Sequence, residues 1–331
     1  MVRCATVTAM VGWEALDALS HQLELCRVDA GTRLVVLIDP GVDADLVALL
    51  RVALARTSAT AMEVRISPEQ CSGHAPLAAA MAASDLVITT GAHQSTDVAG
   101  SQVVHLHAIS PDRFRPHASL RRRVNALVDL VGSATTLSTT DANGTHLTLD
   151  LVGGGVRFDH GLLADDHDRA CFPAGWVKVV PAAATVGGQL VLMPGDANLA
   201  ASRLINSPVV LQIVGDHVAA IEGDSPDADV VRALLEGPAE TSAYGIAGFN
   251  IGLNAGGAER PTFDDRLLDP VISQLLAGVL QISFGDNLIA DRPCTQTITM
   301  ALPGRTLHID DLPIIANGNL QGDIAPDVYE L

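Results

Sequence analysis

The sequence predicts an α/β domain followed by a mainly antiparallel β domain, which together make an α/β plus α+β fold. Up to about residue 134, continuous apolar runs alternate with amphipathic segments. Beyond that point, short segments of alternating polarity are separated by Gly, Pro and Asn-Gly turns. The chain has 331 residues, which is enough for two domains with full cores. We therefore expect one domain at residues 1–134 and another at 135–331.

The first half alternates predicted strands with predicted helices. Residues 33–39 form a continuous apolar run that ends at Pro40, which is typical of a strand buried on both faces. Similar apolar segments predict further strands at 61–66, 86–90 and 103–108. Apolar or Ala-rich segments with helical spacing predict helices at 43–56, 76–83 and 120–131. This alternation favours right-handed crossovers and a parallel sheet.

The second half contains signals for hairpins and few helices. Residues 135–152 predict a hairpin, because Asn143-Gly144 supplies the positive φ that a tight turn needs. Residues 209–221 predict a second hairpin, and residues 305–320 predict a further strand pair. Shorter strands are expected at 176–180 and 189–193, with one helix at 227–235. This pattern predicts a mainly antiparallel sheet.

The composition excludes several classes of protein. Hydrophobic residues make up 48% of the chain and the mean hydropathy is +0.30, so the chain is not intrinsically disordered. No apolar run reaches the roughly 18–20 residues of a membrane-spanning helix. A net charge of −18 provides no basic surface for nucleic acid. The five cysteines are dispersed, which is typical of reduced thiols. We therefore expect a cytoplasmic protein with no nucleic-acid or membrane partner.

Lys178 is the only lysine in the chain. A Schiff-base mechanism would therefore have to use this residue. It lies in the apolar segment 176–180, and we expect its side chain at the protein surface.

Several short segments of the chain resemble, in the same order, sequence blocks of a known family. They are Thr139–Thr148, Cys171–Val177, Gly188–Asp196, Val214–Gly223, Ala243–Asn254, Gly285–Asn287 and Leu307–Gly318. The fifth of these is similar to the block A-Y-x-I-x-H-x-G-x-G-L-N. Together the segments resemble the 2,5-dihydroxypyridine 5,6-dioxygenase family and, more distantly, the aminopeptidase T-like metallopeptidases. The resemblance implies the fold that these two groups share.

The resemblance also implies a metal site in the second domain. The dioxygenases hold Fe(II) with two histidines and one carboxylate. The positions that match these ligands are Gly248, Thr295 and Thr297, and Gln281 matches a ligand position of the metallopeptidases. A glycine, two hydroxyls and an amide bind Fe or Zn poorly. The resemblance therefore implies a scaffold with its metal ligands replaced, so we expect no metal and no cofactor. We expect these four residues to contact substrate instead.

His93 is the expected catalytic residue. It follows the predicted strand 86–90, so it lies where parallel sheets present functional groups. An unperturbed histidine titrates at about pH 6.5, which suits proton transfer near neutrality. In the family that the chain resembles, the matching histidine is directed at the substrate. Asp196 and Glu222 could line the same cleft and contact substrate.

The sequence leaves three functional hypotheses open. The first is a metal-independent isomerase, lyase, cyclase or hydrolase that uses acid/base catalysis on a small polar amide or heteroaromatic substrate. The second is a metal-dependent ring-cleaving dioxygenase or aminopeptidase, with Fe or Zn held by relocated ligands such as His308 and Asp310. The third is a non-catalytic metabolite-binding or partner subunit, since a fold can persist without its chemistry. We also expect a homo-oligomer, with a dimer as the commonest closed form.

Overall fold

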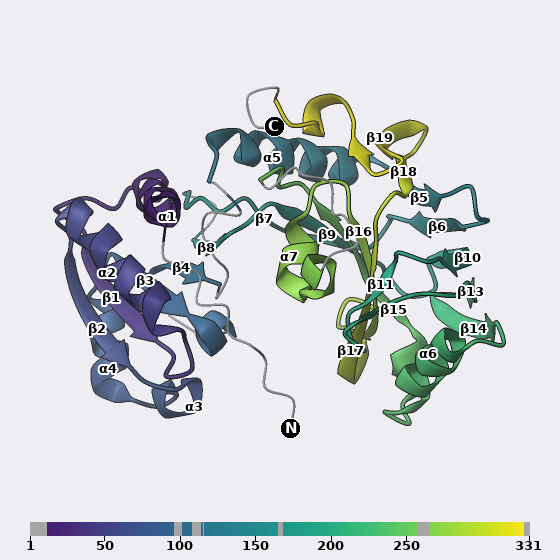
Figure 1. Ribbon diagram of the computed structural model, residues 1–331, viewed down its shortest axis with the longest axis horizontal. Helices are drawn as coiled ribbons and strands as arrows, with labels where there is room; N and C mark the ends of the chain where they lie inside the picture. The colour runs from purple at the N-terminus through teal and green to yellow at the C-terminus, as the bar shows by residue number, and fades with distance from the viewer. Residues whose placement is uncertain are drawn as a thin grey trace. The chain divides into compact units, whose positions relative to one another are not determined.

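A computed structural model describes residues 12–95, 101–107, 114, 116–164, 168–256 and 265–327. The chain forms two units, and Figure 1 labels most of their helices and strands. Unit 1 contains Met1–Ala118 and His160–Ala174, and unit 2 contains Ser119–Asp159 and Gly175–Leu331. Each unit has a hydrophobic core of its own. None of the helices in the described residues is both long enough and apolar enough to cross a membrane.

Unit 1 is built on a parallel sheet, sheet A. Its strands lie in the order β2-β1-β3-β4-β8, and every neighbouring pair is parallel. Their bounds are Thr60–Arg65 for β2, Arg33–Ile38 for β1, Leu86–Thr90 for β3, Gln102–Leu106 for β4 and Arg169–Phe172 for β8. A short 3₁₀ helix, η1 (Gly91–Ser95), follows β3. The carboxyl ends of these strands therefore lie along one edge of the sheet.

Helices cover both faces of sheet A. They are α1 (Trp13–Leu25), α2 (Ala44–Thr57), α3 (Pro68–Cys71) and α4 (Ala75–Ala82). Leu34 and Val36 of β1 pack with α1 and α2. The alternate residues Val35 and Leu37 pack with α3 and α4 on the opposite face. A strand covered on both faces needs apolar residues at every position, which accounts for its continuous apolar sequence.

Unit 2 contains two antiparallel sheets. Sheet B has the strand order β14-β13-β10-β6-β5-β18-β19-β20, and sheet C has the order β12-β11-β17-β16-β15-β9-β7. The strands of sheet B are β5 (Thr136–Thr140), β6 (His146–Asp150), β10 (Val186–Leu192), β13 (Val209–Val214), β14 (His217–Glu222), β18 (Thr306–Ile309), β19 (Leu312–Ala316) and β20 (Asn319–Leu320). The strands of sheet C are β7 (Gly155–Asp159), β9 (Trp176–Val180), β11 (Ala197–Asn198), β12 (Arg203–Leu204), β15 (Ile246–Gly252), β16 (Leu280–Asn287) and β17 (Arg292–Leu302).

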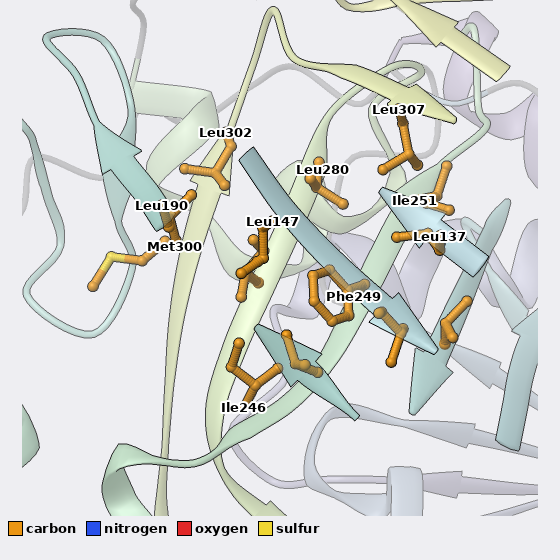
Figure 2. Packing of buried hydrophobic residues seen from close by; sticks show 14 of the residues in the cluster. Leu137, Leu147, Leu190, Ile246, Phe249, Ile251, Leu280, Met300, Leu302 and Leu307 are labelled. Atoms are coloured by element: carbon orange, nitrogen blue, oxygen red, sulfur yellow. The ribbon is translucent and has the colours of Figure 1, made fainter. Parts of the chain in front are cut away.

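Sheets B and C pack face to face around one hydrophobic core. Figure 2 shows Leu137 and Leu147 of sheet B near Phe249 of sheet C, within the cluster that joins the two sheets. Apolar residues of α5 and α6, such as Leu127 and Val231, belong to the same cluster. The helical segments of unit 2 are α5 (Ala118–Ser133), α6 (Pro226–Glu236), α7 (Pro270–Leu275), η3 (Thr241–Tyr244), η4 (Asp265–Leu268) and η5 (Gly322–Ile324).

The predicted fold class is confirmed by the parallel sheet of unit 1 and the antiparallel sheets of unit 2. The expected hairpin at 135–152 corresponds to β5 and β6, and the helix expected at 227–235 corresponds to α6. Helix α1 was not predicted. Its buried Gln22 donates a hydrogen bond to the carbonyl O of Gly161, so a part of its packing depends on a segment far along the chain.

The predicted division at residues 134 and 135 differs from the two units in two places. Residues from Ser119 onward belong to unit 2, because α5 packs into the core between sheets B and C. His160–Ala174 returns to unit 1, because β8 pairs with β4 at the edge of sheet A. A single boundary in the sequence cannot describe this arrangement.

Replacing Phe249 by Ala should strongly destabilise unit 2. Phe249 is 1% exposed, and the loss of a buried aromatic ring costs about 3–5 kcal/mol. The measurement is urea unfolding followed by the fluorescence of Trp176, in a chain whose other tryptophan, Trp13, is replaced by Phe. Leu312→Ala is the control, because Leu312 is 54% exposed and its loss should change stability by about 0.5 kcal/mol or less. Equal losses in the two variants would contradict the packing described.

Candidate functional site

The face of sheet C that points away from sheet B carries a row of polar side chains. Arg157 of β7 lies opposite Lys178 of β9, and Lys178 lies opposite Asn250 of β15. Asn250 in turn lies opposite Gln281 of β16. Residues directly opposite each other project from the same face of a sheet. We call this surface the polar face of sheet C, and define it by Arg157, Lys178, Gly248, Asn250, Gln281, Ser283, Thr297 and Thr299.

Lys178 lies across Gly248 on the polar face. A Cβ atom built on Gly248 would stand 2.5 Å from Cε of Lys178 and 3.0 Å from the carbonyl O of Val179. The lysine side chain therefore fills the space that a side chain at position 248 would need. The sequence predicted the side chain of Lys178 at the surface. In the structure Lys178 is half-buried. Burial and the nearby charge of Arg157 lower the pKa of Lys178, and Asp286 opposes this shift.

Helix α7 covers one end of the polar face. Asp269 begins this helix by accepting hydrogen bonds from two backbone N–H groups of its first turn, and Pro270 follows at the first helical position. Gln281 donates through Nε2 to Ser273 Oγ at 2.8 Å. Asn250 donates through Nδ2 to the carbonyl O of Gln274 at 2.9 Å. The helix thus orients both amide side chains.

The amide oxygen of Asn250, Oδ1, has no hydrogen bond of this kind within the described part of the chain. Asn250 is 3% exposed, and its buried Oδ1 has no hydrogen-bond partner among the residues that the structure describes. The bond from Nδ2 to α7 fixes the orientation of the amide, so a flip would not satisfy Oδ1. A buried acceptor without a partner costs about 1–3 kcal/mol. Such an atom in a folded protein calls for a water or ligand donor.

Hydroxyl groups extend the polar face along β17. Thr299 and Ser283 lie opposite each other, with their hydroxyl oxygens 3.1 Å apart. Thr297 lies opposite Gly285 and is exposed. The structure therefore brings three of the predicted substrate-binding residues, Gly248, Gln281 and Thr297, to one face of one sheet.

Thr295 has a different environment. Its hydroxyl donates to Glu240 at 2.9 Å, and its backbone N–H donates to the other carboxylate oxygen at 3.1 Å. These two bonds lower the pKa of Glu240. The hydroxyl of Thr295 is thus engaged in fixing the start of η3 to β17 rather than directed toward a ligand.

Asp196 and Glu222 occupy other places in unit 2. Asp196 is buried and accepts a hydrogen bond from Nη2 of Arg305 at 2.6 Å, and Arg305 also pairs with Asp141 at 3.2 Å. Burial raises the pKa of Asp196 to about 6 against the opposing effect of Arg305. Glu222 is exposed on the edge strand β14 and accepts a hydrogen bond from Gln212 at 3.0 Å. Both carboxylates therefore have protein partners outside the set of residues that defines the polar face.

His93 lies in η1, directly after β3 and at the carboxyl edge of sheet A. Its ring is fully buried, and Nε2 is 2.6 Å from the carbonyl O of Ile66. A carbonyl can only accept, so Nε2 carries the proton, and Nδ1 is the basic nitrogen of the neutral ring. Asp39 lies at the same edge and accepts a hydrogen bond from the backbone N–H of Ala92 at 2.8 Å. Backbone N–H groups of Gly41 and Ala92 lower the pKa of Asp39.

Two further histidines lie at the carboxyl edge of sheet A. The rings of His105 and His107 pack edge to face, with centroids 4.8 Å apart. Nδ1 of His105 is 2.9 Å from Oγ1 of Thr89. Burial, with smaller effects of His107 and His93, lowers the pKa of His105 to about 3. His105 is therefore neutral at physiological pH and shapes the surroundings of His93 without adding charge.

Asp310 has a structural role in the turn between β18 and β19. Its Oδ1 accepts hydrogen bonds from the backbone N–H and the hydroxyl of both Thr135 and Thr136. These bonds lower the pKa of Asp310, and they tie the turn to the start of β5. His308 lies on β18 opposite Ser138. These four hydrogen bonds give Asp310 a structural role that requires no metal ion.

The described residues do not fit the iron or zinc that the resemblance implies. Gly248 has no ligating side chain, Thr295 is bonded to Glu240, and the amide of Gln281 is oriented by α7. Within the described ranges, no group of three His, Cys, Asp or Glu side chains could hold a metal ion.

A family model for NicX, 2,5-dihydroxypyridine 5,6-dioxygenase, matches residues 14–322. The chain belongs to the 2,5-dihydroxypyridine 5,6-dioxygenase family. The match covers most of both units, so the polar face of sheet C and the carboxyl edge of sheet A are parts of the family scaffold. No curated protein matches the chain significantly in sequence.

Solved structures show the same fold. The structure of 2,5-dihydroxypyridine dioxygenase from Pseudomonas putida KT2440 superposes with a TM-score of 0.78 at 20% identity, over 93% of this chain and 97% of that one. Wild-type AmpT from Thermus thermophilus superposes with a TM-score of 0.61 at 12% identity, over 93% of this chain and 99% of that one. These likenesses confirm the predicted aminopeptidase T-like fold of this family member.

Lys178 and Asn250 of the polar face were not among the residues predicted to contact substrate. Lys178 lies between Val177 and Val179, and Asn250 lies between Phe249 and Ile251. In both places a single polar residue interrupts apolar neighbours, which is the period-two signal of a strand with one polar face. Reading that signal in both segments would have predicted that these side chains point away from the core.

The buried cluster of Asp141, Arg305 and Asp196 predicts a pH-dependent stability. The pKa of Asp196 is raised to about 6 from an unfolded value of about 3.9. The folded chain therefore binds an extra proton between these values, and the stabilisation from this group is full below about pH 4 and lost as the pH rises through about 6. Urea unfolding of Asp196→Asn between pH 4 and 7 should lack this fall. The exposed control Asp224→Asn should keep it, and the same slope in both variants would contradict the assignment.

Proposed function

We propose that this family member binds a small heteroaromatic or amide molecule on the polar face of sheet C and transforms it by metal-independent acid/base chemistry. The observation that carries the proposal is the set of groups on that face: one lysine, two oriented amides and several hydroxyls. These groups donate and accept hydrogen bonds, as the polar atoms of a ring or an amide require. Isomerase, lyase, cyclase and hydrolase reactions are the classes that proton transfer alone can serve.

The proposed binding residues are Gln281 and Thr297, with Gly248 leaving room for the lysine side chain. Gln281 has a fixed amide, because Nε2 donates to Ser273, and Thr297 presents an exposed hydroxyl. Each of the other three predicted contacts has a protein partner instead: Thr295 bonds to Glu240, Asp196 to Arg305 and Glu222 to Gln212.

We propose His93 of unit 1 as an acid/base residue, independently of the binding residues named on unit 2. The bond from Nε2 to Ile66 selects the tautomer in which Nδ1 accepts a proton. His105 lies nearby, and burial lowers its pKa to about 3, so it adds no charge to the surroundings of His93. A cytoplasmic location and a homodimer remain predictions from the sequence.

Metal-dependent ring cleavage is the second candidate function, and the family match favours it. It would require ligands other than the groups described at positions 248, 281, 295 and 297. A third outcome is a protein that binds metabolites without transforming them. Metal content separates the first two candidates, and turnover separates the first from the third.

Elemental analysis of the protein purified without chelator tests the metal-independent proposal. We expect less than about a tenth of an equivalent of Fe, Zn, Mn or Co, and no shift of the unfolding temperature when these ions are added. A specific site saturated at about 100 times its Kd would stabilise the fold by about 2.7 kcal/mol, which is readily measured. Near-stoichiometric metal, or a stabilisation that chelator reverses, would establish the second candidate in place of the first.

Replacing His93 should remove turnover more than binding. Loss of a general acid or base typically costs about 10²–10⁴ in rate. His93→Gln keeps a donor for the carbonyl O of Ile66 but cannot take up a proton near neutrality. His74→Gln is the matched control, because His74 is an exposed residue at the start of α4. The assay follows a panel of hydroxypyridines and cyclic amides by mass spectrometry. Binding by the natural chain with no turnover of any compound would favour the third outcome.

A further inference from the structure

Lys178 has an environment unlike that of an ordinary surface lysine. Its side chain lies along the polar face of sheet C, with Cε over Gly248, and its ammonium group makes no hydrogen bond or ion pair within the described residues. A lysine at a surface normally extends its charged end into water or toward a carboxylate. Here the stem is instead held against a glycine, and the amine stays on the face that carries the oriented amides.

The charged groups near Lys178 leave its amine available to a ligand. Arg157 on β7 and Asp286 on β16 have opposing effects on its charge, and burial favours the neutral amine. Asp286 does not come within ion-pair distance. A half-buried cation without a neutralising partner interacts more strongly with an added anion than an exposed cation does, because less water screens it.

Asn250 provides a second, independent indication of a ligand. It lies opposite Lys178 in the register of β15 and β9, and its buried Oδ1 has no donor among the described residues. The amide cannot turn without losing its bond to Gln274. A donor supplied by a bound molecule, or by a water that accompanies it, would satisfy this oxygen.

We propose that Lys178 is the cationic group of this site, and that its amine binds an anionic oxygen attached to a planar ring. The proposal rests on the function proposed above, in which substrate binds on the polar face of sheet C. An ammonium donates up to three hydrogen bonds and neutralises an oxyanion. Lys178 thus gives the site a positive charge from within the chain.

The amine also provides a balanced proton transfer. When the ligand arrives as a neutral ring hydroxyl, the neutral amine of Lys178 accepts its proton, and an ammonium–oxyanion pair forms. The O–H bond breaks and the N–H bond forms, with no change in oxidation state. When the product leaves as a neutral molecule, the same proton returns to its oxygen. A lowered pKa makes the neutral amine accessible for this step.

Because the chain has one lysine, nuclear magnetic resonance can observe this side chain alone. Biosynthetic labelling with ¹³C,¹⁵N-lysine gives one set of side-chain signals, which Lys178→Met removes. We would titrate the labelled protein with 2-hydroxypyridine and, separately, with pyridine-2-carboxylate, to distinguish a ring oxygen from a carboxylate. We expect one of the two probes to shift the Cε and Nζ signals and to raise the pKa of Lys178. Signals that neither probe moves would overturn the proposal.

Calorimetry of variants provides the complementary measurement. Lys178→Met keeps an unbranched apolar stem as far as Cε and removes the amine and its charge, so the Kd of the bound probe should rise by about tenfold or more. Arg65→Gln is the matched control, since it removes one exposed positive charge from the edge strand β2 of unit 1, and the Kd should change by about threefold or less. An unchanged Kd in Lys178→Met would overturn the proposal.

Failure of the proposed role of Lys178 can be distinguished from failure of the proposed metal-independent function. Bound metal, detected by elemental analysis, would contradict the metal-independent function whatever the probes do. If the protein is metal-free and Lys178→Met leaves the Kd of the probe unchanged, the metal-independent function stands and only the proposed role of Lys178 is contradicted. If Lys178→Met fails to fold, the lysine side-chain signals of the natural chain, titrated with the two probes, still test the role of Lys178.

Discussion

The alternation of side chains along the strands of sheet C is the constraint on which unit 2 depends. Phe249 and Ile282 point into the core shared with sheet B, so their neighbours Asn250 and Gln281 must project from the other face. A register shift of one residue would place amides in the core and rings on the polar face. Burial of the apolar set therefore determines which polar groups assemble around Lys178.

Local signals predicted much of the fold. The apolar run at 33–39 and the Asn143-Gly144 turn each identified an element correctly, because covered strands and tight turns impose strict local requirements. Strand β15 has no clear alternation of burial, since it is buried along its whole length. Helix α1 packs in part through Gln22 and the distant Gly161. Such elements are specified by tertiary contacts that a local pattern does not contain.

The site could be predicted only in part for the same reason. The place of His93 after a buried strand follows from the local pattern, and the resemblance located Gly248, Gln281 and Thr297. The ion pair between Asp196 and Arg305 joins residues that are 109 positions apart, so a turn motif alone could not reveal it. The position of Lys178 over Gly248 likewise joins two strands that the sequence separates widely.

The chain passes between the two units three times, after Ala118, after Asp159 and after Ala174. Sheet A is therefore incomplete while the first strands of unit 2 are synthesised, and β4 has a free edge until β8 leaves the ribosome. Open parallel edges can pair with other chains. Fragments that end before His160 should thus associate or aggregate, and cotranslational folding of unit 1 must wait for residues that follow β7 in the sequence.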